Sequence, residues 1–174
     1  KYGFTDDQVR KYTFNSAPFL ADPRAAQQGY LTSEPYTIAK EAGVTPKVFL
    51  LADEGYPGYA TMVLAPDSLI DANPAAVKAF VAASAKGWQD YLYGDPAPGD
   101  ALIRKDNREM TQDVLDQARV AMKTHGIVDN GDPTTIGRMS DARWTTFFNM
   151  AACQGVYPKT LDYQRAYTLQ FLAK

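Results

Sequence analysis

The sequence predicts an α/β protein, because short apolar segments of strand character alternate with segments that carry helix caps. The expected strands are rich in β-branched and aromatic residues and cover 9–14, 30–33, 47–52 and 59–65. Helix-like segments separate the first three, and strands joined through helices lie parallel. Segment 47–52 is apolar almost throughout, as is typical of a strand covered on both faces. We therefore expect parallel or mixed sheets flanked by helices.

Capping residues and prolines begin the expected helices, and most of them end at a glycine. They cover 22–29, 34–43, 74–92, 101–105, 111–125 and 140–154. The tail 167–172 is expected to be a short strand or helix. Apolar side chains recur at helical spacing in the three longest of these segments, so each has one face suited to a core.

The stretch Gly55-Tyr56-Pro57-Gly58-Tyr59 is the best candidate for a hinge, because glycine and proline interrupt two apolar segments there. It divides the chain into residues 1–55 and residues 56–174. The expected strand 59–65 has no obvious neighbour nearby in the sequence, although a buried strand needs partners for its backbone groups. This gap predicts that the chain is part of a larger α/β protein.

Composition limits the class of protein. With 174 residues the chain is long enough for a real core, and its net charge of −2 gives no electrostatic reason to expect nucleic acid as a partner. No apolar run approaches the ~20 residues that a membrane span needs. One cysteine, Cys153, excludes an internal disulfide and a cysteine-based metal cage, and we expect it to be a buried structural thiol.

Catalytic motifs are absent from the sequence. It contains no GxGxxG, GxxxxGK[ST], HExxH or CxxC. The single histidine, His125, stands at the end of an expected helix, where a histidine more often complements the helix dipole than acts in a triad. We therefore expect no enzyme activity, no metal and no cofactor.

The residues that follow the expected strands carry the ligand-binding hypothesis. In open α/β sheets, ligands bind beyond the carboxyl ends of the strands. The candidates at those ends are Asn15, Phe19, Ser33, Glu34, Tyr36, Tyr56 and Tyr59. Aromatic faces, one acid and free N–H groups at helix starts suit a small, flat, partly polar molecule. The alternative is that Glu34 is a helix-start acid and that Tyr36 and Tyr59 are core residues.

Three stretches, GYLTSEP, GYPGY and NPAAVKAFVAASAKGW, give the sequence a resemblance to a known family. It resembles the substrate-binding proteins of bacterial ABC importers of the thiamine-pyrimidine-precursor, alkanesulfonate and nitrate type. The resemblance covers nearly the whole chain. Such proteins are two-lobed, with the type II periplasmic-binding fold. They close on a solute at a hinged cleft and deliver it to a permease in the inner membrane.

The resemblance implies that the N-terminal half of the receptor is missing here, so that Lys1 corresponds to the middle of such a chain. Residues 1–55 would form the later part of the second lobe, and residues 56–174 the hinge crossing and the C-terminal part of the first. It also implies a periplasmic location, or an extracellular one with a membrane tether. Glu34 and Tyr36 would face the cleft, and Tyr56 and Tyr59 would line its hinge side.

An acid with aromatic residues favours an aminopyrimidine-like ring over a small anion as the solute. One rival is a pyrimidine-precursor synthase on the same fold. That enzyme class uses an active-site histidine and a cysteine-rich iron motif, whereas this chain has one histidine and one cysteine. Another rival, a sensory solute-binding domain, is left open by the sequence.

Overall fold

The computed structural model of the chain describes residues 2–172, and all regular structure in that range is helical. The elements are η1 (Asp6–Gln8), α1 (Ala17–Ala21), α2 (Glu34–Ala42), α3 (Asp67–Ala72), α4 (Pro74–Tyr93), α5 (Ala97–Asp106), α6 (Gln112–Thr124), η2 (Pro133–Thr135), α7 (Asp141–Cys153) and η3 (Tyr163–Ala166). Because no strand or bridge occurs in the described range, the predicted α/β fold with parallel or mixed sheets is wrong for this structure.

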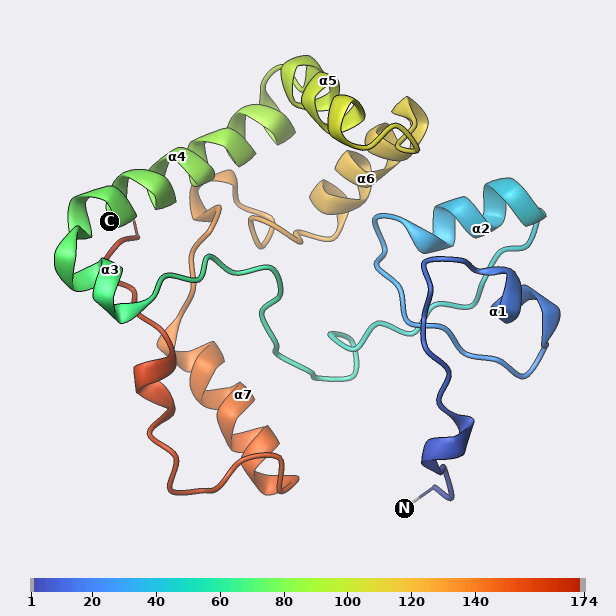
Figure 1. Cartoon of the computed structure of the whole chain (residues 1–174), viewed down its shortest axis with the longest axis horizontal. Helices are drawn as coiled ribbons and strands as arrows, with labels where there is room; N and C mark the ends of the chain where they lie inside the picture. Colours follow the sequence, from blue (N-terminus) through green and yellow to red (C-terminus); the bar gives the residue numbers. More distant parts are fainter. Residues whose placement is uncertain (1, 173–174) are drawn as a thin grey trace.

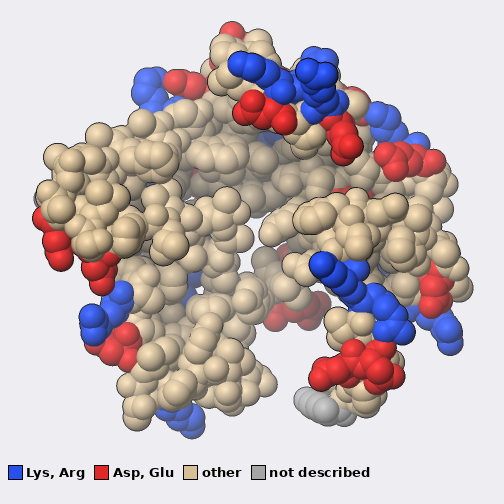
Figure 2. All heavy atoms as spheres, in the orientation of Figure 1, with Lys and Arg blue, Asp and Glu red and all other residues tan. Residues whose placement is uncertain are grey.

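The helices follow an open course rather than forming layers. Figure 1 shows α3, α4, α5 and α6 along an arc, with α2 beyond the end of α6 and α7 on the opposite side of the picture. A long irregular segment, residues 44–66, runs from α2 back to α3 through the middle of the view. Figure 2 shows the surface hollowed between the part that contains α7 and the N-terminal part.

Local turns replace two of the predicted strands. In segment 30–33 the amide of Ser33 donates to the carbonyl of Tyr30 at 3.0 Å. In segment 47–52 the chain turns at Leu51, whose carbonyl accepts from the amide of Tyr56 at 2.9 Å. A strand needs its backbone groups paired along a neighbour. Here the backbone groups bond to other backbone groups only three to five residues away in the sequence, so neither segment forms a strand.

Backbone conformation interrupts the other two predicted strands. Phe14, at the end of segment 9–14, has a φ of 59°, and Thr61, inside segment 59–65, has a φ of 56°. Positive φ is unfavourable for aromatic and β-branched residues and breaks an extended run. The predicted strands 9–14 and 59–65 are therefore wrong for this structure.

Helices with strong local signals are confirmed. The long helix α4 begins where predicted, with Asn73 Oδ1 accepting from the amide of Ala76 at 3.1 Å and Pro74 in the first turn. Ser140 Oγ caps α7 by accepting from the amide of Arg143 at 3.3 Å. Gly43 ends α2 in the left-handed region, with a φ of 65°.

Other expected elements differ from the structure. The helix expected at 22–29 is absent, and α1 instead lies between that segment and the expected strand 9–14. Asp22 Oδ1 accepts from the amide of Arg24 at 2.9 Å, which makes a turn of what the sequence suggested was a helix start. Helix α5 begins at Ala97, before the expected start at residue 101. The described part of the tail forms neither helix nor strand.

One buried carboxylate joins α4, α5 and α6. Asp100 on α5 accepts from the hydroxyl of Tyr91 at 2.8 Å, from Gln112 Nε2 at 2.6 Å and from Arg119 Nη1 at 2.7 Å. The side chains of Asp100 and Arg119 are only 7% and 13% exposed. Burial raises the pKa of Asp100, but the bonds from Gln112, Tyr91 and Arg119 outweigh it and hold the pKa below its usual value.

A second buried acid lies at the C-terminal end of α4. Asp129 is fully buried and accepts from the hydroxyl of Tyr93 and, at 2.9 Å, from the amide of Gly131. These bonds fix the loop after α6 against the last turn of α4. The loop therefore returns the chain toward α7 in a defined direction.

We predict that Asp100→Asn lowers the free energy of unfolding by about 3 kcal/mol, because it removes the buried counter-charge of Arg119 and leaves only the exposed Asp116 to pair with the guanidinium. Urea unfolding followed by circular dichroism measures the change. The matched control is Lys86→Ala, which removes an exposed i,i+4 pair with Asp90 and should cost no more than about 0.5 kcal/mol. Equal losses for the two variants would contradict a structural role for the buried pair.

Candidate functional site

The junction before α2 builds a small cradle around the carboxylate of Glu34. Glu34 Oε1 accepts from the hydroxyl of Tyr12 at 3.1 Å, and Oε2 accepts from the amide of Tyr30 at 2.8 Å and from the hydroxyl of Ser33. Gly29 passes so close that a Cβ there would lie 2.9 Å from Glu34 Cβ. The cradle therefore depends on a glycine at position 29.

The cradle keeps Glu34 ionised. Burial raises the pKa of the half-buried carboxyl, but the bonds from Ser33, the Tyr30 amide and Tyr12 outweigh it, so the pKa lies below its usual value. The backbone N–H of Glu34 itself also lowers this pKa, so four donors surround a carboxylate that offers about four acceptor positions. A donor from a ligand would bind the half-buried carboxylate by sharing or displacing one of them.

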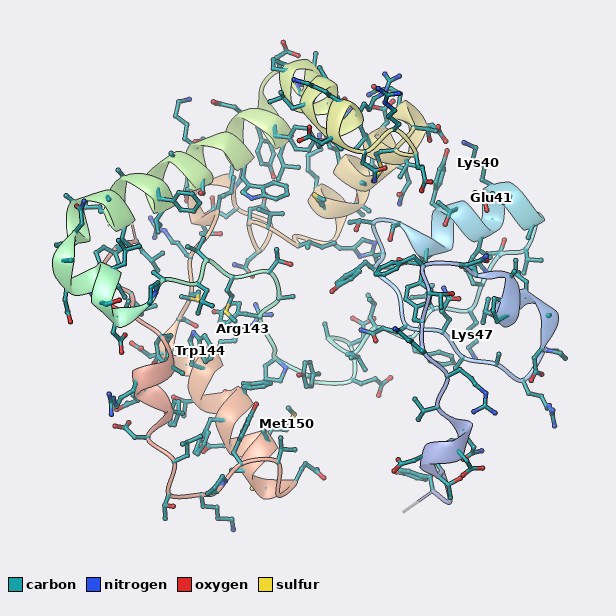
Figure 3. The ribbon with its side chains drawn as sticks, viewed as in Figure 1. Lys40, Glu41, Lys47, Arg143, Trp144 and Met150 are labelled. Carbon is teal, nitrogen blue, oxygen red and sulfur yellow. The ribbon has the colours of Figure 1, made fainter. Side chains whose placement is uncertain are left out.

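Tyr36 attaches α2 to α6 through Asp113, which lies on α6. Its hydroxyl and Lys40 Nζ each donate to Asp113 Oδ2 at 2.7 Å. The bond to Asp113 raises the pKa of Tyr36, and the bonds from Lys40 and Tyr36 lower the pKa of Asp113. Gln117 Nε2 also donates to the carbonyl of Leu31 at 3.3 Å. In Figure 3, Lys40 lies on the side of α2 that faces α6.

Tyr56 and Tyr59 lie against α7. The ring of Tyr56 meets Phe147 edge-on with centroids 5.7 Å apart, and Tyr59 packs at 5.9 Å from Trp144. Arg143 holds the segment between the two tyrosines. Its Nε donates to the carbonyl of Pro57 at 2.8 Å and its Nη2 to the carbonyl of Gly58 at 2.9 Å. Its guanidinium lies over the Tyr59 ring at 4.2 Å.

Of the remaining predicted residues, Asn15 lies two residues before α1 and Phe19 lies within it. Asn15 Oδ1 accepts from the amide of Ala17 at 2.8 Å, which forms a local turn before the helix, and Phe19 is half-buried. The contact of Ser33 with Glu34 is the only one described that joins two predicted residues. No hydrogen bond or ring contact described joins Glu34 to Tyr56 or Tyr59. Figure 3 shows their neighbours, Lys40 on α2 and Arg143 on α7, on opposite sides of the molecule. The ligand-binding roles stay predictions.

Sequence reasoning missed Tyr12, Asp113 and Arg143, which hold the predicted residues in place. Each acts across a long separation in the chain, and a single sequence offers no signal for such pairing. It also placed Cys153 in the interior, whereas the thiol is exposed. His125 follows α6 and is exposed.

Cavities of about 500 and 350 Å³ lie between α5 and the start of α6, away from the Glu34 cradle. The larger is lined by three cationic side chains, Arg104, Lys105 and Arg108. Within residues 2–172, no group of histidine, cysteine, aspartate and glutamate side chains could hold a metal ion. None of the described helices is long and apolar enough to cross a membrane.

We predict that Glu34→Gln lowers the free energy of unfolding at pH 7 by about 1 kcal/mol, because the half-buried hydrogen bonds lose their negatively charged acceptor. The folded pKa of Glu34 is depressed, so its stabilisation is present above the unfolded pKa of about 4.3 and disappears as pH falls through the folded value. The difference between the two proteins should therefore narrow below about pH 4 in urea titrations at a series of pH values. Glu41→Gln, on the exposed side of α2, is the control. A pH-independent difference would count against the cradle.

We predict that Arg143→Lys loosens the segment from Tyr56 to Tyr59, because an ammonium cannot reproduce the planar fork that reaches two carbonyls. The free energy of unfolding should fall by about 1–2 kcal/mol, and chymotrypsin should cleave after Tyr59 or Leu64 faster. Arg165→Lys, at an exposed arginine, is the control. Unchanged cleavage would show that the aromatic contacts alone hold the segment.

Comparison with known protein families gives a match. A family model described as NMT1/THI5 like matches residues 1–97, which include the Glu34 cradle, α2, the segment bound by Arg143 and all of α4. Searches of curated proteins and of solved structures returned no match to the chain.

Proposed function

The chain belongs to the NMT1/THI5-like family, and from that membership we propose that it is the solute-binding component of an ABC-type importer. The family match is the observation that carries this proposal, because it covers more than half of the chain and is consistent with a solute-binding role. A binding role without catalysis is consistent with this family, whose members are mostly binding proteins.

The proposed solute is an aminopyrimidine-like ring. The half-buried, ionised carboxylate of Glu34 suits an amino donor, and a neutral ring can stack on an aromatic neighbour. Tyr12, which bonds Glu34, lies 5.3 Å from the ring of Phe14, so aromatic surface adjoins the acid. No cation bonds Glu34 among the described residues, and this argues for a donor-bearing solute over a sulfonate or nitrate.

The proposed partner is a permease in the inner membrane, and the proposed location is periplasmic, or extracellular with a membrane tether. We also propose that the boundary between the two parts of the receptor falls at residues 55/56. It would lie in the irregular segment that joins α2 to α3 and just before the carbonyls held by Arg143. The site on this chain would be completed by further polypeptide of the same receptor.

We predict that 4-aminopyrimidine binds the 174-residue chain weakly, with a Kd of about 1 mM, because its amino group must share the Glu34 carboxylate with the donors of the cradle. Saturation-transfer NMR should detect it more strongly than unsubstituted pyrimidine, and Glu34→Gln should remove the difference. Glu41→Gln should leave it unchanged.

Three results would contradict the proposal in different ways. Binding of taurine or nitrate in preference to pyrimidines would reverse the choice of solute. Tight binding of any of these solutes by calorimetry would show that this chain contains a complete site. Absence of any signal at millimolar ligand would remove Glu34 as a contact.

A further inference from the structure

The two cavities between α5 and the start of α6 adjoin each other. The larger, of about 500 Å³, and the smaller, of about 350 Å³, share the lining residues Ala101, Arg104 and Gln112. Neither is lined by a residue of the Glu34 cradle. Ligand pockets in proteins have volumes of about 300–1,000 Å³, so each cavity is large enough to receive part or all of a small molecule.

The charged side chains that line the larger cavity are all cationic. Arg104, Lys105 and Arg108 line it, and its remaining lining residues are uncharged. Asp106 and Glu109 belong to the same stretch of chain but do not line the cavity. In Figure 2, basic side chains gather over α5 at the top of the view, beside acidic ones. Because the whole chain has a net charge of −2, the cavity is a local concentration of positive charge, which attracts anions.

The three cations have no partner in the part of the chain that the structure describes. Within residues 2–172, none of their side chains makes a hydrogen bond, an ion pair or a contact with an aromatic ring. The acid that lines the smaller cavity, Asp100, is already bonded to Arg119. Like charges around one cavity repel one another, and an anion bound between them would remove that repulsion.

The start of α6 adds backbone donors at the same cavity. Thr111, the residue before the helix, and Gln112, its first residue, both line the cavity. The Thr111 side chain does not cap the helix, and among the described residues the amides of Gln112, Asp113 and Val114 donate no hydrogen bond. Free N–H groups at a helix start favour a nearby anion. They supplement the three cations, which carry the assignment.

The number of donors distinguishes a phosphate from a carboxylate. A phosphate group has three strong acceptor oxygens, one for each of the three cations, and arginine binds phosphate through two parallel N–H bonds. A carboxylate has two oxygens and would leave one cation without an oxygen of its own. The cavity also has an uncharged part, which includes Ala101 and Met110. An organic group attached to the phosphate could lie against it.

We propose that the cavity between α5 and α6 binds a phosphate monoester, whose phosphate group lies among Arg104, Lys105 and Arg108. A monoester carries close to two negative charges at pH 7, and its organic part extends toward the smaller cavity. A lipid headgroup offers the same chemistry, but a hollow of this volume suits a small molecule, and the experiment below separates the two sources. The site shares no residue with the Glu34 cradle, so this proposal and the proposed function can fail independently.

An NMR titration of the isotope-labelled 174-residue chain with phenyl phosphate tests the proposal. The amide signals of Thr111 and Gln112 should shift, with a Kd of about 0.1–1 mM at low ionic strength. Binding should weaken in about 0.15 M salt, because exposed charges are screened. Benzoate, which carries the same ring on a carboxylate, is the ligand control and should bind at least about fivefold more weakly.

A pair of double variants shows whether the cavity or the net charge attracts the ligand. Arg104→Gln with Arg108→Gln removes two of the three cations and should raise the Kd at least about tenfold. The matched control, Lys78→Gln with Arg165→Gln, removes the same charge at exposed positions outside the cavity and should raise the Kd less than about twofold. All four side chains are exposed, so both variants should fold, and circular dichroism checks this.

The proposal fails on any of three results. Equal weakening in the two double variants would mean that the charge of the whole chain, rather than a defined site, attracts phosphate. Benzoate that binds as tightly as phenyl phosphate would show that the cavity does not select a phosphate group. Binding to vesicles that contain phosphatidic acid, dependent on Arg104 and Arg108 and without any shift from phenyl phosphate, would make a lipid surface the occupant.

Discussion

The ion pair between Asp100 and Arg119 is the interaction on which the arrangement of α4, α5 and α6 depends. It lies where α4, α5 and α6 meet, and a tyrosine and a glutamine complete the hydrogen bonding of the carboxylate. A buried acid without these donors would be unstable as an anion, so the three helices can approach only in the orientation that supplies all of them. The apolar positions of α4 give no comparable directional constraint.

Helix α6 connects this centre to the candidate site. Arg119 faces Asp100, while Asp113, two turns earlier, receives Tyr36 and Lys40 from α2. The position of α2 therefore follows from that of α6, and the Glu34 cradle lies at the start of α2. A disturbance at the buried pair would reach the cradle through one rigid helix of 13 residues. Among the described residues, the segment held by Arg143 makes its side-chain contacts with α7.

Local signals in the sequence were sufficient for the longer helices α2, α4, α6 and α7, wrong at 22–29, and insufficient for the strands. Asn73 with Pro74, Ser140 and Gly43 mark helix ends through contacts within four residues, and these helices are confirmed. Strand formation in 59–65 depends on a neighbour that lies elsewhere in a chain, and Thr61 instead adopts a left-handed conformation. The place of Glu34 at a helix start was predictable from the following Pro35. Its donor Tyr12 and the clamp formed by Arg143 were not, because both act between segments far apart in the sequence.

The exposed thiol on α7 gives the molecule a single chemical handle. Cys153 is the only cysteine in the chain, so a maleimide dye would attach at one position, at the end of the helix whose first turns hold the segment from Tyr56 to Tyr59. Trp144 lies nine residues earlier on the same helix, about 14 Å away along its axis. An indole and an acceptor dye so close together form a resonance-energy-transfer pair. The efficiency of transfer between them would report whether α7 is intact.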